Sequence, residues 1–185
     1  MKPSPRDRLL DAADELFYEE GIRSVGIDRV IERAGVAKAS LYSTFGSKDE
    51  LVRAYLTRRL ESRQARLREA VEAQITPRDK IMAVYQYLAR TSARPGYRGC
   101  AFINASAEAT PGSAAAEVTN LSREYLHGLF RDLATQAGVG DPEALAQGLM
   151  LLYDGAVIGT RLDHDPGVAQ AAQSAAATLL DAALA

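Results

Sequence analysis

The side chains best suited to chemistry are clustered in one short segment, and they are mainly hydrogen-bond donors. The segment carries Lys38, Ser40, Tyr42 and Ser43, and a further lysine follows at position 48. Lysine and hydroxyl groups donate to phosphate oxygens, and serine or lysine can also reach the edges of bases. This set is suited to contacting a nucleic acid. An ordinary helical hairpin with a solvated face would carry similar residues, and this alternative stays open.

The distribution of charge around the segment favours DNA as the partner. No acidic residue occurs between Glu32 and Asp49, whereas Arg33, Lys38 and Lys48 are basic. Because the phosphates of a duplex repel carboxylates, such a gap suits a surface that contacts DNA. The whole chain has a formal net charge of −2. A DNA-binding protein needs only a local excess of positive charge, so this value excludes nothing.

Two short helices are predicted to position these side chains. Apolar residues recur at helical spacing over residues 27–34, and Gly35 follows at the place where a helix commonly ends in a left-handed residue. Over residues 38–45, Leu41 and Phe45 are four residues apart and would face inward together. Two helices joined by a short turn that contains glycine form a helix-turn-helix, whose second helix enters the major groove of DNA.

The stretch GIRSVGIDRVIERAGVAKASLYSTFGSKDELV resembles the N-terminal domain of TetR-type (tetracycline-repressor-like) transcriptional regulators. The matching residues are Gly21, Ile27, Val30, Ala34, Gly35, Val36, Leu41, Tyr42, Phe45, Lys48 and Leu51. The resemblance covers about the first quarter to third of the chain. It implies that Tyr42 and Lys48 hold phosphates, while exposed positions of the second helix read bases.

One position departs from the family pattern. The residue that opens the first helix of the motif is usually serine or threonine, and here it is Gly26. A phosphate at that helix end would be held by backbone N–H groups, assisted by Ser24. The predicted DNA-binding residues are Ser24, Gly26, Ala37, Lys38, Ser40, Tyr42, Ser43 and Lys48.

The remaining chain is predicted to be helical. Apolar residues make up 47% of the sequence, enough for a core, and no strand pattern occurs. We expect an all-α fold of about nine helices, with a three-helix DNA-binding domain at residues 1–50. Residues 51–185 would form a larger helical domain for ligand binding and dimerisation. The helix predicted from Lys48 to about Gln74 is rich in arginine and glutamate, and a face of mixed charge is usually solvated.

Two late helices are predicted to form a homodimer contact, as the resemblance implies. One face of the first carries small and apolar residues, and Gly155 and Gly159 are four apart, which lets helices approach closely. The predicted dimerisation residues are Leu145, Leu149, Leu152, Ala156, Gly159, Leu179 and Leu180. The alternative is that both helices pack entirely inside one copy of the chain.

The resemblance also implies a small-molecule site in the C-terminal domain. Such sites combine apolar walls with a few polar groups. The predicted ligand-binding residues are Tyr85, Phe102, Asn104, Tyr125, His127, Tyr153 and Asp154. Aromatic residues at helical spacing more often form a hydrophobic core, so this assignment competes with a structural one.

The sequence offers little for catalysis. Of its two histidines, His127 and His164, neither has a histidine or cysteine at metal-ligand spacing. Cys100 could act as a nucleophile if a base lay near it, but a lone cysteine in an apolar segment is more often a packing residue. No glycine-rich phosphate loop occurs. We therefore expect no enzyme activity, no metal and no cofactor.

The composition favours a cytoplasmic protein with no membrane partner. No run approaches the roughly 18 consecutive apolar residues of a membrane span. The first residues, MKPSPRDR, lack the apolar segment of a secretion signal. One cysteine cannot form an internal disulfide, which is consistent with a reducing compartment.

Together these patterns predict a homodimeric repressor that a small molecule releases from a palindromic operator. A ligand-independent DNA-binding regulator or activator is the alternative. A small helical enzyme that uses Cys100 is a distant one.

Overall fold

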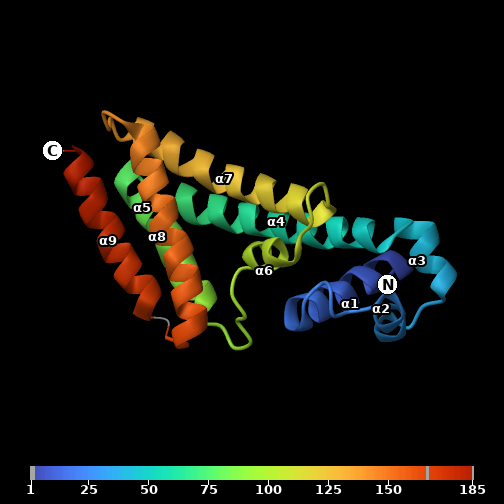
Figure 1. The fold of residues 1–185 in the computed structure, drawn as a ribbon. Helices are drawn as coiled ribbons and strands as arrows, with labels where there is room; N and C mark the ends of the chain where they lie inside the picture. Colours follow the sequence, from blue (N-terminus) through green and yellow to red (C-terminus); the bar gives the residue numbers. More distant parts are fainter. Residues whose placement is uncertain (1–2, 166, 185) are drawn as a thin grey trace. The chain divides into compact units, whose positions relative to one another are not determined.

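The computed structural model describes residues 3–165 and 167–184, and these residues form nine α-helices and no strand (Figure 1). The helices are α1 Pro5–Glu20, α2 Ile27–Ala34, α3 Lys38–Phe45, α4 Lys48–Glu72, α5 Pro77–Ser92, α6 Ala101–Glu108, α7 Ala114–Gln136, α8 Pro142–Asp163 and α9 Gly167–Leu184. The predicted all-α fold is confirmed. Among the described residues, no helix is both long and apolar enough to span a membrane.

The chain divides into two compact units. The first contains Met1–Glu61 together with Cys100–Ser122, and the second contains Ser62–Gly99 together with Arg123–Ala185. The first unit therefore combines the predicted helix-turn-helix with α6 and the beginning of α7. The predicted boundary at residue 50 separates a DNA-binding domain from a domain for ligand binding and dimerisation, and this functional division remains a prediction.

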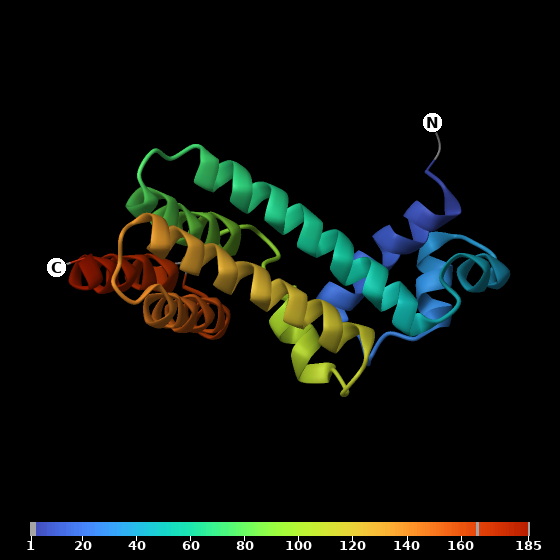
Figure 2. The same cartoon turned by 90° about the horizontal axis from the view of Figure 1, so that it is seen from above.

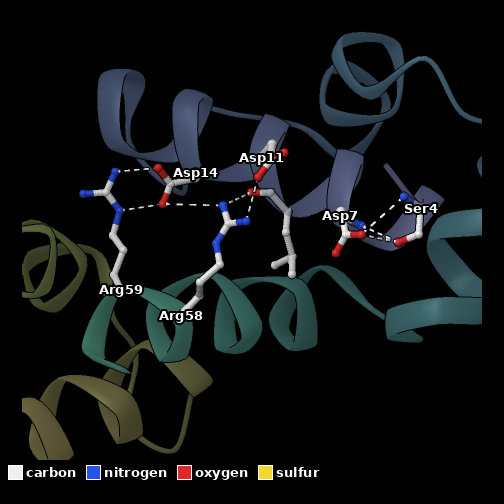
Figure 3. Close-up of polar contacts among 7 residues, drawn as sticks. Ser4, Asp7, Asp11, Asp14, Arg58 and Arg59 are labelled. Carbon is white, nitrogen blue, oxygen red and sulfur yellow. Dashed lines mark hydrogen bonds and ion pairs between the residues drawn. The ribbon is translucent and has the colours of Figure 1, made fainter. Parts of the chain in front are cut away.

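Local signals explain the helices of the first unit. The side chain of Ser4 accepts a hydrogen bond from the backbone of Asp7, and the Asp7 carboxylate accepts one from the Ser4 backbone, so α1 begins with a capping box (Figure 3). Helix α2 ends at Gly35, whose φ of 61° is left-handed. The core of the unit buries Leu41 completely, and Leu16 and Phe17 of α1 belong to the same cluster. This cluster fixes α3 with its other sides outward.

Arginines of α4 bind acids of α1, which the sequence did not predict (Figure 3). Arg59 donates to both carboxylate oxygens of Asp14 at 2.7 and 2.8 Å, and Arg58 donates to Asp11 at 2.7 Å. The Arg59 guanidinium also lies 4.1 Å from the centre of the Tyr18 ring. The expectation of a merely solvated face was therefore wrong for this part of α4. The acids that the arginines bind lie more than forty residues away in the sequence, which helical periodicity cannot detect.

The second unit is built around α5, α8 and α9. Helix α9 packs on both α5 and α8, and Figure 2 shows α8 and α9 side by side. Two glycines of α8 permit this close approach: a Cβ at Gly148 would lie 2.7 Å from Leu179, and one at Gly159 would lie 2.8 Å from Val168. A larger residue at either position would require Leu179 or Val168 of α9 to shift.

Candidate nucleic-acid interface

Helix α3 contains half of the residues predicted to contact DNA, and it presents an exposed surface. Its outward side chains include Lys38 and Ser43, and Tyr42 is 47% exposed. Leu41 is fully buried on the opposite side, and Phe45 is partly buried beside it. The apolar contacts therefore hold the helix while its polar side faces solvent. This is the arrangement that a recognition helix requires.

One hydroxyl residue of α3, Ser40, is less exposed than predicted. Ser40 is only half exposed, and its carbonyl oxygen accepts from Ser43 Oγ at 3.2 Å and from Thr44 Oγ1 at 2.6 Å. Ala39 is exposed and lies opposite Leu41 on the helix. Sequence reasoning overlooked Ala39 because it has no hydrogen-bonding group, although a methyl group can contact the methyl of thymine. The helical spacing from Leu41 would have identified it.

Lys38 forms an ion pair with an acid of α2. Its Nζ donates to Asp28 Oδ1 at 2.8 Å, and both side chains are well exposed. The hydrogen bond and the charge of Asp28 raise the pKa of Lys38, so the amine stays protonated. A lysine ammonium has three protons, which leaves two for other acceptors. Asp28 also places a negative charge beside α3, and it lies before the acid-free segment that follows Glu32.

The helix ends of the motif leave backbone donors available. Gly26 is the N-cap residue before α2 and Ala37 is the N-cap residue before α3, and neither provides a side-chain hydrogen bond to the helix end. Both are exposed, as is Ser24. The first N–H groups of a helix have no intrahelical partner and attract anions. These positions are therefore geometrically suited to phosphate contacts, and phosphate binding by them remains a prediction.

Arg8 of α1 stabilises the turn between the two helices. Its Nη1 donates to Gly35 O at 2.9 Å. Gly35 is the left-handed residue that ends α2, so this carbonyl lies at the corner of the motif. A positive side chain at the C-terminal end of a helix also interacts favourably with the helix dipole. Arg8 thereby ties α1 to the turn, a role that no local sequence pattern indicated.

Lys48, predicted to bind a phosphate, is partly buried. Its Nζ donates to Ile22 O at 2.6 Å and lies 5.9 Å from the centre of the Phe17 ring. Burial lowers the pKa of Lys48, and the opposite charge of Glu108 partly offsets that effect. The amine is thus positioned by the loop between α1 and α2 rather than extended into solvent.

Comparison with known proteins agrees with this geometry. Residues 9–55 match the family model of bacterial regulatory proteins of the tetR family. The fold is similar to that of SCO4454, a TetR-family transcriptional regulator from Streptomyces coelicolor, with a TM-score of 0.92 and 32% sequence identity. That similarity covers 98% of this chain and 96% of the other. This chain belongs to the TetR family of transcriptional regulators.

Two other relatives of this TetR-family regulator match only in part. The transcriptional activator FasR of Mycolicibacterium smegmatis is 36% identical over 81 residues, which is 44% of this chain and 37% of FasR. The transcriptional repressor KstR2 of Mycobacterium tuberculosis is 32% identical over 82 residues, 44% of this chain and 41% of KstR2. The chain thus matches about two fifths of the length of each. These relatives are regulators rather than enzymes, as the sequence predicted for this chain.

The residues predicted to bind a ligand in this TetR-family regulator are divided between the two units. Phe102 and Asn104 belong to the first, and the other five belong to the second. Tyr85 and Tyr153 are buried, with ring centres 6.2 Å apart. The Tyr85 hydroxyl donates to Leu149 O at 2.7 Å, and burial raises the pKa of Tyr85. The two tyrosines therefore have the surroundings of core residues.

The polar members of that set also have partners within the chain. Asp154 accepts from Arg123 at 2.7 Å, and His127 Nε2 lies 3.1 Å from Glu143. Tyr125 is half-buried. A hollow of about 430 Å³ lies in the first unit between α1, α3 and α4, and none of the seven predicted residues lines it. Ligand binding by these residues remains a prediction.

Most residues of the predicted dimerisation face are covered within one copy of the chain. Leu145, Leu149, Ala156 and Leu180 are buried within a single copy of the chain, and Gly159 faces Val168 of the same copy. Leu152 is half-buried, and Leu179 is 37% exposed. The buried members of the set therefore pack inside one copy, as in the alternative left open by the sequence. Leu152 and Leu179 keep accessible surface, and dimerisation through this set remains a prediction.

A different stripe of α8 is apolar and exposed. Leu151 is 71% exposed, Ile158 is 46% exposed and Leu162 is 70% exposed. Gly155 lies among them, and a Cβ there would have nothing within 4 Å. These four residues, spaced four, three and four apart, form one face of the helix. We call them the α8 stripe. Periodicity could not select this stripe, because α8 carries apolar residues on several sides.

Proposed function

We propose that this TetR-family regulator binds a two-fold symmetric operator as a homodimer and represses transcription. The observation that carries the proposal is α3, held from behind by buried Leu41 while Tyr42 and Ser43 remain exposed. In a dimer, two such helices would enter successive major grooves, with centres about 34–36 Å apart or a multiple of that distance. The regulator would act in the cytoplasm, because its target DNA lies there.

The α8 stripe supports the dimer. Three large apolar side chains that remain exposed along one helix face are suited to association, because covering them removes apolar surface from water. A two-fold contact would bring the stripe against its own copy. Leu179, which lies against Gly148 beside the stripe, would add to the contact.

Selection of duplexes by the purified protein tests DNA recognition. Fragments enriched from a random pool should share a palindrome, because each half-site would contact one copy of α3. Ser43→Ala should alter the selected bases, whereas Tyr42→Phe should leave the bases unchanged and weaken binding. Absence of any enriched sequence, even in dilute salt, would refute the proposal.

Release by a small molecule is the regulatory part of the proposal. The larger C-terminal part would take up a ligand and change the separation of the two copies of α3, and the ligand must prefer one of the two states to have this effect. A screen for compounds that raise the thermal stability of the protein, followed by release from the selected duplex, tests it. If no stabilising compound releases the duplex, the ligand-independent regulator is favoured.

Activation is a second candidate function, because the relative FasR is an activator. The sign of regulation is tested by transcription in vitro from a promoter that contains the selected palindrome. Less transcript in the presence of the protein supports repression. More transcript supports activation, with the same DNA-binding surface in use.

A further inference from the structure

One peptide group in the loop between α1 and α2 is held at both ends by charged side chains. The carbonyl oxygen of Ile22 accepts from Lys48 Nζ at 2.6 Å. The N–H of the same peptide, that of Arg23, donates to Glu108 Oε2 at 2.6 Å. Lys48 begins α4 and Glu108 ends α6, so residues distant in sequence meet at one peptide of the first unit.

The neighbouring glycine shows how closely the carboxylate approaches the loop. A Cβ on Gly21 would lie 2.8 Å from Glu108 Oε1, closer than such atoms come in proteins. Gly21 also has a φ of 93°, which disfavours other residues. The loop therefore has a backbone shape that admits the Glu108 carboxylate.

The two hydrogen bonds reinforce each other. Each involves a charged group, and such bonds are shorter and stronger than neutral ones. A carboxylate that accepts from a peptide N–H also polarises the C=O of that peptide, which strengthens the bond to Lys48. The negative charge of Glu108 in addition favours the protonated form of the partly buried Lys48.

Further contacts hold the segment that carries Glu108. The Asp49 carboxylate accepts from Ala114 N, the first residue of α7, at 3.2 Å. Arg53 of α4 forms an ion pair with Glu117 of α7. These contacts join the start of α4 to the segment that follows α6, all within the first unit. Glu108 is thus held on a braced segment rather than on a free helix end.

We propose that Glu108 is a positioning residue for DNA binding: by holding the Ile22–Arg23 peptide, it places Lys48 where its remaining protons meet a DNA phosphate. The inference rests on the proposed DNA-binding function. It assigns to α6, which lies outside the predicted DNA-binding residues 1–50, a direct part in the geometry of the phosphate contact. Any movement of α6 would then alter the contact made by Lys48.

Two substitutions separate the reach of the Glu108 side chain from its charge. Glu108→Asp keeps the charge but shortens the side chain by one methylene, so the bond to Arg23 is lost. Glu108→Gln keeps the reach and offers an amide oxygen as acceptor. We expect the aspartate variant to bind the selected duplex at least about tenfold more weakly, the scale of one charged hydrogen bond. The glutamine variant keeps the bond to Arg23 but loses its charge, so it should lose less affinity than the aspartate variant. Glu19→Gln on α1 controls for the loss of one acid.

The salt dependence of binding shows whether the effect passes through Lys48. Loss of one phosphate contact reduces the slope of log K against log salt by about 1. Glu108→Asp should reduce the slope by this amount, as Lys48→Ala does, and should have no further effect in a protein that already carries Lys48→Ala. Thermal unfolding checks that each variant is folded. If the aspartate variant is unfolded, Glu108→Ala replaces it, with the same expected loss of slope.

The outcomes distinguish this inference from the proposed function. A wild-type protein that binds no duplex refutes both. A wild-type protein that binds, with an aspartate variant of equal affinity and slope, refutes only the role of Glu108. A glutamine variant with a reduced slope, or an aspartate effect that persists unchanged in the Lys48→Ala background, also overturns it.

Discussion

Truncation of Leu151 should weaken the proposed homodimer. This side chain is 71% exposed at one end of the α8 stripe. Full burial of a leucine contributes about 1.5–3 kcal/mol. Burial of the exposed part of Leu151 in the dimer would therefore contribute about 1.5 kcal/mol per copy, and Leu151→Ala would lose this contribution. Two-fold symmetry doubles the loss to about 3 kcal/mol, which raises the dimer dissociation constant about 150-fold.

Sedimentation equilibrium over a dilution series measures that constant. Ile75→Ala is the matched control, because Ile75 is 92% exposed in the turn after α4 and lies outside the stripe. It should leave the dimer intact. Leu149→Ala provides a second comparison: Leu149 is fully buried, so its truncation should lower the free energy of unfolding by about 2–5 kcal/mol instead.

Two results would refute the assignment of the α8 stripe. One is a Leu151→Ala dimer whose dissociation constant equals that of the wild-type dimer. The other is an Ile75→Ala dimer weakened as strongly as the Leu151→Ala dimer, which would show that loss of exposed apolar surface acts without regard to its position. Operator binding should follow the dimer constant, because each copy supplies one recognition helix.

Three further predictions concern the first unit. Tyr42→Ala should weaken binding to all duplexes and leave the salt slope unchanged, because a neutral hydroxyl releases no counterion, measured by fluorescence anisotropy; an unchanged affinity removes Tyr42 from the phosphate contacts. Arg59→Met should lower the free energy of unfolding by about 2 kcal/mol, between the values for exposed and buried ion pairs, because Asp14 loses both hydrogen bonds. Urea titration measures it, and Arg59→Lys should recover only part, since lysine lacks the planar fork. Burial raises the pKa of Tyr55. Its contribution to stability is therefore complete below about pH 10, where the unfolded tyrosine begins to ionise, and is lost as pH rises further. Alkaline unfolding should begin at a higher pH in Tyr55→Phe than in the wild type. Identical unfolding curves would contradict the contribution of Tyr55 ionisation.

The sequence by itself determined the helices and the DNA-binding motif. The signals are local: glycines end α1, α2 and α3, apolar residues four apart mark the buried side of α3, and proline follows a cap at α5 and α8. Each signal acts over a few residues, through backbone conformation or side-chain spacing. For this reason the spacing of residues along α3 was enough to predict that Tyr42 is exposed and that Leu41 is buried.

Only the tertiary structure decided which side of α8 is covered and what the charged residues bind. Leu149 and Leu151 are the same residue type on one helix, yet the first is fully buried and the second is 71% exposed. Their difference depends on where α5 and α9 pack, and helical periodicity contains no information about that. The same holds for Arg59 with Asp14, and for Glu108 with the Ile22–Arg23 peptide: these partners meet because the fold closes long loops of chain, and their interaction is fixed by distances that spacing along the sequence cannot supply.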